Sequence, residues 1–258
     1  GSGIVSKGIF TNESALARAL GIEKLKEEKS LNASAGLTFR PLSRLYITAD
    51  AYYIKVDDRI VLTSEFVNPL IQSYGVEGAR FFTNAIDTET KGIDVVATYK
   101  VFIGEGNLDI SLSGNYTETE ITGYHFPEVF GGDRNEYFGP DQTNIIESLS
   151  PKTKASLGLV YNISKWNFLV RNTYFGKVTR DGYPFGSVQH HDPKLVTDFS
   201  VSYEILKNFS LTLGGNNIFD VFPDKQIYDN SYYNVFKYAP VQMGTTGANW
   251  FARLNVSF

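Results

Sequence analysis

Side chains that commonly do chemistry are scarce in this chain, which has three histidines, one methionine and no cysteine among its 258 residues. The lack of cysteine excludes disulfide frameworks, thiolate zinc sites and cysteine nucleophiles. His190 and His191 are adjacent, but neighbouring side chains on an extended segment point in opposite directions and do not converge on one ion. We therefore interpret His190-His191-Asp192 as a solvated loop rather than as a metal pair.

Other polar stretches give no stronger chemical signal. The segment Asp133–Glu136 offers acidic and amide oxygens, but Tyr137 and Phe138 break the calcium-loop pattern, which alternates oxygen ligands and has glycine at its sixth position. No serine is flanked by elbow glycines, so a Ser-His-Asp nucleophile is not supported. The net charge of −4 argues against a nucleic-acid partner, because binding phosphates needs a basic surface. The sequence predicts neither an enzyme nor a metal or cofactor site.

Aromatic side chains in the long connections are the remaining candidates for binding a ligand. Tyrosines mixed with Asn, Asp and Gly are typical of adaptable recognition surfaces, and their rings can stack on sugars or on iron-chelator rings. The alternative interpretation is that the same rings pack the loops onto each other and onto lipid headgroups. The selected ligand-binding candidates are Tyr124, Phe126, Tyr137, Tyr183, Tyr232 and Tyr233.

The elements that position these residues are predicted from a period of two. Apolar and polar residues alternate in stretches of roughly ten, which is the length that a tilted membrane strand needs. Charges within the strand cores all fall on the polar face, as expected if a charge facing lipid at the midplane costs ~2–4 kcal/mol. The nine expected strands are Leu31–Arg40, Leu45–Asp57, Phe82–Val101, Leu108–Glu120, Lys154–Tyr161, Trp166–Phe175, Leu195–Ile205, Phe209–Phe219 and Gly247–Phe258.

Connections between the expected strands alternate in length. The short turns are Arg40–Arg44, Phe102–Asn107, Asn162–Lys165 and Leu206–Asn208, and the long connections are Ile60–Arg80, Ile121–Ser150, Gly176–Lys194 and Asp220–Thr246. An antiparallel meander with all short turns at one end is typical of an outer-membrane barrel. Residues 1–29 are expected to form an external segment with a short helix from an N-cap at Asn12 through Leu20, followed by Gly21.

The position of aromatic residues indicates which face meets lipid. Trp166 and Tyr174, like Trp250 and Phe258, are eight residues apart on the apolar face, a spacing that projects to roughly 20 Å in a tilted strand. This distance resembles the separation of the two aromatic girdles of a membrane barrel, and the residues between them are aliphatic and often small. The alternatives are a soluble carbohydrate-binding β-barrel or sandwich and an adhesin barrel that transports nothing.

Two motifs resemble those of TonB-dependent outer-membrane receptors. Gly214-Gly215-Asn216-Asn217-Ile218-Phe219-Asp220, followed by Pro223, is similar to the strand-ending "GxNNLFD…P" pattern of that family. The last strand, from Trp250 to Phe258, resembles the C-terminal assembly signal that the barrel-assembly machinery reads. Leu45–Val61 and Asn84–Thr98 are also similar to receptor sequences, so the resemblance extends from about Leu20 to the end.

This resemblance implies an all-β fold, an antiparallel up-and-down transmembrane β-barrel, of which residues 1–258 form about nine strands of a 22-stranded whole without the N-terminal plug. It also implies that the intact protein imports a scarce nutrient, such as a siderophore, cobalamin or a glycan fragment. Its location is then the outer membrane. Its expected partners are membrane lipid, the plug domain and TonB through the missing N-terminal part, the barrel-assembly machinery and a lipoprotein lid of the kind that glycan importers use.

Overall fold

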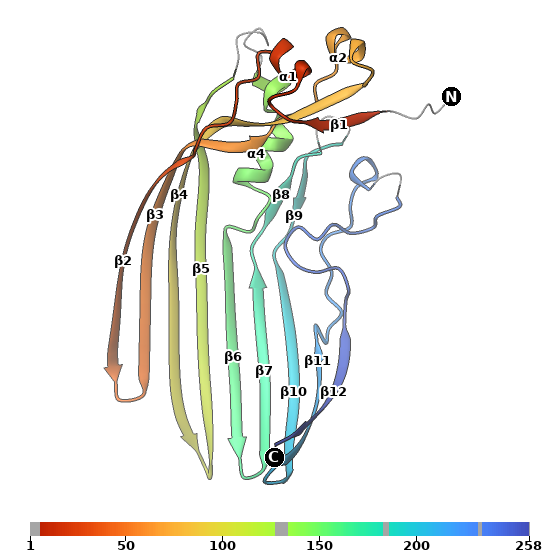
Figure 1. Ribbon diagram of the computed structural model, residues 1–258. Helices are drawn as coiled ribbons and strands as arrows, with labels where there is room; N and C mark the ends of the chain where they lie inside the picture. The colour runs from red at the N-terminus through yellow and green to blue at the C-terminus, as the bar shows by residue number, and fades with distance from the viewer. Residues whose placement is uncertain (1–5, 127–133, 183–185, 232–233, 258) are drawn as a thin grey trace.

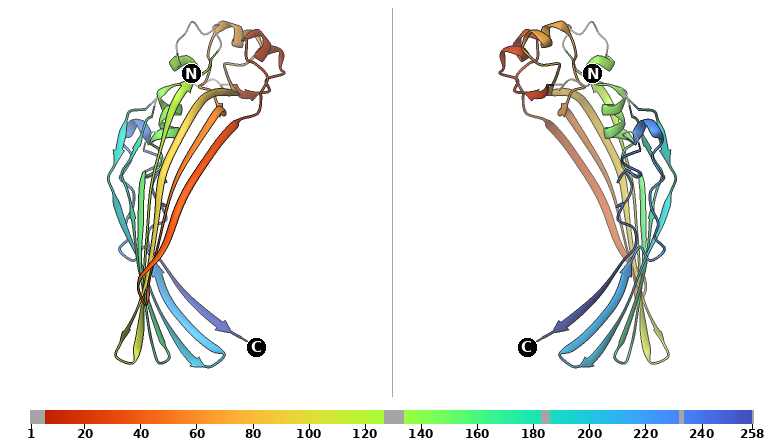
Figure 2. Two further views of the ribbon diagram at one scale, coloured as in Figure 1. Left: turned by 90° about the vertical axis from the view of Figure 1, so that its left-hand side faces the viewer. Right: turned by 90° about the vertical axis from the view of Figure 1, so that its right-hand side faces the viewer.

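A single curved sheet dominates the computed structural model, which describes residues 6–126, 134–182, 186–231 and 234–257. Nine antiparallel strands follow the order β12-β11-β10-β7-β6-β5-β4-β3-β2 and form a wall (Figures 1 and 2). Among the described residues, β2 and β12 form its two edges and do not pair with each other. The strands are β2 (Lys29–Leu42), β3 (Leu45–Leu62), β4 (Gly78–Ile103), β5 (Gly106–Tyr124), β6 (Thr153–Ile163), β7 (Trp166–Phe175), β10 (Lys194–Leu206), β11 (Phe209–Asn216) and β12 (Asn249–Val256).

The predicted alternation of short and long connections is confirmed. Four two-residue turns join strands at the lower end of Figure 1, and the long connections and helices lie at the upper end. Gly104 and Ser164 begin two of these turns with φ values of +58° and +50°, in the left-handed region that tight hairpin turns use. Up-and-down topology with all short turns on one side follows from this pattern.

Strand register confirms the predicted polar face. Residues that pair across neighbouring strands share one face of a sheet, and Asp50 pairs with Asp94 while Arg171 pairs with Asp198. The same face carries cross-strand hydrogen bonds between polar side chains. These join Thr38 and Thr48 at 3.1 Å, Asn115 and Asp94 at 2.6 Å, and Ser202 and Thr212 at 2.8 Å.

The opposite face leaves its apolar side chains exposed instead of burying them. Leu157 is 37% exposed and Leu254 is 57% exposed, and beside the short turns the rings of Trp166 and Tyr203 contact each other with centroids 4.5 Å apart. A soluble barrel or sandwich would bury these leucines in a dry core. The exposed apolar face therefore argues against the soluble alternative.

Three strands extend four or five residues beyond their predicted ends, toward the long connections. β3 continues to Leu62, β4 begins at Gly78 and β5 ends at Tyr124, so the loops expected from Ile60 and Ile121 start later than predicted. The physical reason is a compact hydrophobic core above the membrane-length part of the wall. Along β4, Ala79 and Phe81 are fully buried because side chains from the long connections cover one face there.

The N-terminal segment builds much of this core. β1 (Lys7–Phe10) pairs in parallel with β4, and α1 (Ala15–Ala19) buries Leu16 and Ala17. The helix N-cap is Ser14, whose hydroxyl accepts a 3.1 Å hydrogen bond from the Ala17 amide, so the prediction of Asn12 as N-cap is wrong. Asn12 instead donates to the Glu23 carbonyl. Gly21 follows the helix with a φ of +69°, as expected of a residue that ends a helix.

The remaining elements lie in the long connections. They are α2 (Pro69–Ser73), α3 (Arg134–Tyr137), α4 (Pro140–Glu147), β8 (Val178–Arg180), β9 (Gln189–His191) and the 3-10 helix η2 (Tyr228–Asn230). In the part of the chain that is described, no helix is long and apolar enough to span a membrane.

The two adjacent histidines lie in the β8-β9 hairpin rather than in a solvated loop. His190 is exposed, whereas His191 is fully buried, so their side chains do point in opposite directions. The interpretation of both as solvated is wrong because the connection between β11 and β12 packs over this hairpin. Its Gln242 side chain donates hydrogen bonds to the carbonyls of Gly176 at 2.6 Å and Asp192 at 3.0 Å.

Candidate ligand-binding site

A cavity of about 440 Å³ opens beside the hydrophobic core at the long-connection end of the wall. Four segments that are distant in sequence form its walls. They are the chain after α1, the outer part of β4, the end of β5 with the residues after it, and α3. The lining residues are Glu23, Lys24, Lys26, Thr83, Asn84, Tyr124, His125, Phe126 and Tyr137.

One wall of the cavity is aromatic. The ring of Tyr137 lies 6.0 Å from that of Phe126 and 5.7 Å from that of Phe66, measured between centroids. Tyr124, the last residue of β5, contacts Phe138 at 6.3 Å. Core packing from α3 and β4 thus holds three of the six predicted ligand-binding residues at one cavity.

Tyr137 supports this wall more than it faces solvent. It is 1% exposed, and its hydroxyl donates a 2.8 Å hydrogen bond to Thr83 Oγ1. Burial raises the pKa of the Tyr137 phenol, because the ionised form loses hydration there. Tyr137 is therefore a neutral hydrogen-bond donor at physiological pH, and Tyr124 and Phe126 offer more accessible ring surface.

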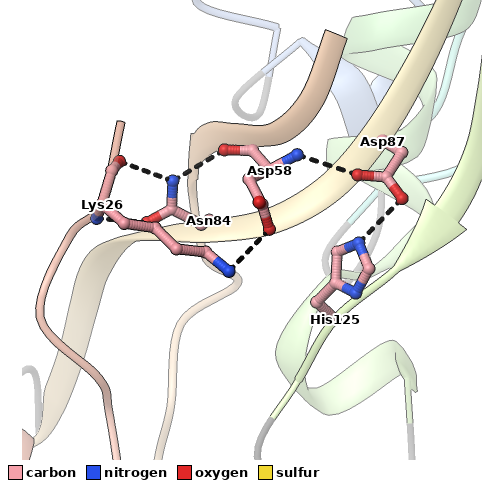
Figure 3. Close-up of polar contacts among 5 residues, drawn as sticks. All are labelled: Lys26, Asp58, Asn84, Asp87 and His125. Carbon is pink, nitrogen blue, oxygen red and sulfur yellow. Dashed lines mark hydrogen bonds and ion pairs between the residues drawn. The ribbon is translucent and has the colours of Figure 1, made fainter. Parts of the chain in front are cut away.

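A polar network adjoins the aromatic wall (Figure 3). Asn84 of β4 binds the main chain of Lys26 twice, since its side-chain oxygen accepts from the Lys26 amide at 3.0 Å and its nitrogen donates to the Lys26 carbonyl at 2.9 Å. The same nitrogen donates to the Asp58 carbonyl at 2.7 Å. This one amide side chain joins the N-terminal segment to β3 and β4.

Asp58 occupies an irregular point of β3. Its φ is +57°, and the pairing of β3 with β4 shifts register between Val56 and Arg59. Such a bulge turns the amide of Asp58 toward Asp87 of β4, whose Oδ1 accepts it at 2.8 Å. The other oxygen of Asp87 lies 2.8 Å from Nε2 of His125, which follows β5. Three neighbouring segments of the wall thereby place two carboxylates and one imidazole together.

Charge in the network is partly compensated. Lys26 Nζ lies 2.8 Å from Asp58 Oδ1, and this hydrogen-bonded ion pair lowers the pKa of Asp58 and raises the pKa of Lys26. Both groups therefore stay ionised near neutral pH. The network contains two carboxyl groups, those of Asp58 and Asp87, against the single ammonium group of Lys26. The cavity edge is suited to a cationic or metal-containing ligand group.

Sequence comparison identifies the family. Residues 5–218 match the family described as "TonB dependent receptor-like, beta-barrel", which is well over half of the chain. This chain belongs to the TonB-dependent receptor β-barrel family. As a receptor barrel of this family it is a protein of the outer membrane, as predicted. No curated protein matches the sequence of this chain.

Solved structures similar to the receptor barrel confirm its fold. The copper transporter OprC is 19% identical, with a TM-score of 0.59, and the match covers 92% of this chain and 32% of OprC. YddB from Escherichia coli is 12% identical, with a TM-score of 0.61 and coverages of 100% and 35%. The pyoverdine receptor FpvA from Pseudomonas aeruginosa PAO1 is 15% identical, with a TM-score of 0.59 and coverages of 92% and 31%. The chain thus spans about a third of each relative.

Among the other predicted site residues, Trp250 alone lies within the described part of the receptor barrel, and it does not line this cavity. Tyr183, Tyr232 and Tyr233 lie outside the described residues, as does Phe258 of the predicted assembly signal. Trp250 is on β12 and 71% exposed. A second cavity of about 720 Å³ lies between α4 and the connection from β11 to β12.

Sequence reasoning missed Asp58, Asp87 and His125 as a group. Asp58 lies 29 residues from Asp87, and Asp87 lies 38 residues from His125. A local signal does exist at Asp57-Asp58-Arg59, where consecutive charges interrupt the alternation of β3. Such an interruption in a long strand indicates a bulge, but it does not identify the partner residues.

Proposed function

We propose that this chain is the C-terminal part of the barrel of a TonB-dependent receptor, completed by further strands and a plug domain outside the chain. In this proposal the intact receptor imports a scarce nutrient with energy that TonB passes to the plug. The expected partners are outer-membrane lipid, the plug, TonB, the barrel-assembly machinery acting on the last strand, and a lipoprotein lid if the cargo is a glycan.

The observation that carries the proposal is the cavity at the outward end of a wall that belongs to this receptor family. Tyr124 and Phe126 supply ring surface there, and Lys26, Asn84 and His125 supply polar groups. Aromatic surface beside a few fixed polar groups is the usual composition of a small-molecule site. Among the similar structures, OprC is a copper transporter, FpvA is a pyoverdine receptor and FyuA from Yersinia pestis is a ferric yersiniabactin uptake receptor. We therefore favour a metal or a metal chelate over cobalamin or a glycan.

Uptake by living cells tests this proposal. We would delete the gene in the native host and measure growth and uptake of radiolabelled metal under metal limitation, with a panel of siderophores, with and without a functional tonB gene. Import predicts a defect that the wild-type gene restores, and only when TonB is present. Tyr124→Ala and Phe126→Ala should each reduce uptake, because they remove ring surface from the cavity.

Tyr74→Ala is the matched control, since Tyr74 follows α2 at the same end of the wall, is 45% exposed and does not line this cavity. It should leave uptake unchanged. Unchanged uptake in the deletion strain, together with reduced attachment to surfaces, would contradict import and favour an adhesin barrel.

A further inference from the structure

Asp58, Asp87 and His125 come from three different segments and offer ligand atoms that all lie within 4.8 Å of one another. The pair of His125 Nε2 and Asp87 Oδ2 is the closest at 2.8 Å. In a tetrahedral zinc site with bonds of about 2.0–2.1 Å, neighbouring ligand atoms are separated by roughly 3.3 Å. The observed separations bracket this value, so small side-chain rotations bring the three atoms to coordination distance.

The main chain around these side chains is held in place by hydrogen bonds. The His125 amide donates to the Ala85 carbonyl at 2.7 Å, and the Asp58 amide and carbonyl are held by Asp87 and Asn84. The His125 side chain is 48% exposed, whereas those of Asp58 and Asp87 are each 21% exposed. A positioned set of ligands with one accessible member has an entry path for an ion.

The chemistry of this donor set selects a class of ion. One imidazole nitrogen with two carboxylate oxygens suits Zn²⁺ and similar divalent transition ions, whereas Ca²⁺ and Mg²⁺ prefer sites made only of oxygens. We propose that Asp58, Asp87 and His125 bind a divalent transition-metal ion, with Zn²⁺ as the representative. Lys26 leaves room for an ion, because it pairs with only one carboxylate oxygen of Asp58 and its side chain is 58% exposed.

Three protein ligands leave a fourth coordination position open, as in zinc sites that bind a further molecule. His125 also lines the cavity beside Tyr124 and Phe126. A metal ion held here would therefore lie at the edge of the cavity, with its open position available to water or to a donor atom of a ligand within it.

The test uses the purified full-length receptor in detergent, freed of metal with a chelator and titrated with zinc chloride by calorimetry near neutral pH. His125→Gln and Asp87→Asn should each weaken zinc binding at this site by at least about tenfold. The matched control is Asp57→Asn, because Asp57 is next to Asp58 but pairs with Lys55 at 2.9 Å. It should bind zinc like the wild type.

A second measurement keeps the inference testable if a variant fails to assemble. Diethyl pyrocarbonate modifies accessible imidazoles, and mass spectrometry follows the rate at His125 in the wild-type receptor. Zn²⁺ should slow this reaction and Mg²⁺ should not. A loss of zinc affinity smaller than that stated, or equal modification of His125 with and without zinc, would overturn the inference. Neither assay involves TonB or transport, so the result is independent of the import proposed above.

Discussion

The backbone amide of Asn217 donates a 2.9 Å hydrogen bond to a carboxylate oxygen of Asp198, which ties the end of β11 to β10. Asn217 has a φ of +50°, and its side chain exchanges two hydrogen bonds with the backbone of Val221, at 2.7 and 2.9 Å. Three residues on, Asp220 accepts from the Ala248 amide just before β12. The asparagine of the receptor-like motif is thus a turn residue that ends one strand and anchors the return to the next.

Asn217→Ala should destabilise the assembled receptor by about 2–3 kcal/mol, because it removes two hydrogen bonds from a residue that is 7% exposed and puts alanine in a left-handed conformation. Asn217→Gly should cost less, since glycine accepts that backbone conformation. Urea unfolding of receptor reconstituted in vesicles measures both. Asn216→Ala is the control, as Asn216 is exposed and bonds only to Asn249 among the contacts described here. Equal stability of all three variants would refute this role.

Tyr137→Phe should lower the free energy of unfolding of the outer core by about 1 kcal/mol, because Thr83 then loses its buried hydrogen-bond donor. Resistance of the receptor to protease at increasing temperature reports the change. A double-mutant cycle with Thr83→Val should give a coupling energy of similar size. Tyr74→Phe, at an exposed position, should have no effect. Additive effects of the two core substitutions would contradict the contact.

Leu157→Arg should destabilise the inserted receptor by about 2–4 kcal/mol, since Leu157 pairs with Leu112 on the face assigned to lipid. The neighbouring Ser156→Arg places the same charge on the polar face and should cost much less. Equilibrium unfolding in lipid vesicles compares the two variants. A larger loss for Ser156→Arg would reverse the assignment of the faces.

The number of strands in the wall, their phase and the short turns were predictable because each depends on a local rule, whereas β1, β8 and β9 were not predicted. Leu157 and Ser156 lie on opposite faces of β6. A shift of the strand by one residue would exchange their environments, so the alternation of apolar and polar residues indicates which face each side chain occupies. The two-residue turn at Gly104 is likewise predictable from the neighbouring residues in the sequence. The hydrophobic core above the membrane-length part of the wall was not predictable in this way. Its strands continue the alternation of the membrane part, while the hydrophobic cluster that contains Phe81 also includes Leu16 of α1 and Tyr137 of α3, far away in sequence.

The candidate site was predictable only in part. Tyr124 and Phe126 belong to one aromatic segment and were found by composition. Asn84 and Lys26 form hydrogen bonds although they are 58 positions apart in the sequence. No local pattern in a single sequence indicates a contact over that distance. The burial of His191 was not predictable either. It is a polar residue in the connection between β7 and β10, and it is fully buried because the connection between β11 and β12 packs over it.

His191 leads to a prediction about pH. Burial lowers its pKa, opposed by the nearby Asp224 carboxylate and assisted by the positive charges of Arg180 and Lys194. Within the described chain neither ring nitrogen has a hydrogen-bond partner, so the folded hairpin favours the neutral ring. When the pH falls below about 6.5, the unfolded segment binds a proton before the folded one does. The hairpin should therefore be most stable above about pH 6.5 and lose stability as the pH falls toward the lowered pKa.

Hydrogen–deuterium exchange of the assembled receptor, corrected for intrinsic rates, measures this loss of stability at β9 and around Gln242 in the connection between β11 and β12. Both should open more often at pH 5.5 than at pH 8, because Gln242 donates to the carbonyl of Asp192 directly after His191. His191→Leu should abolish the pH dependence, since leucine takes up no proton. His190→Leu should preserve it, because His190 is exposed and binds only the Thr179 hydroxyl among its described contacts. A pH dependence that survives in His191→Leu would assign the effect to another group.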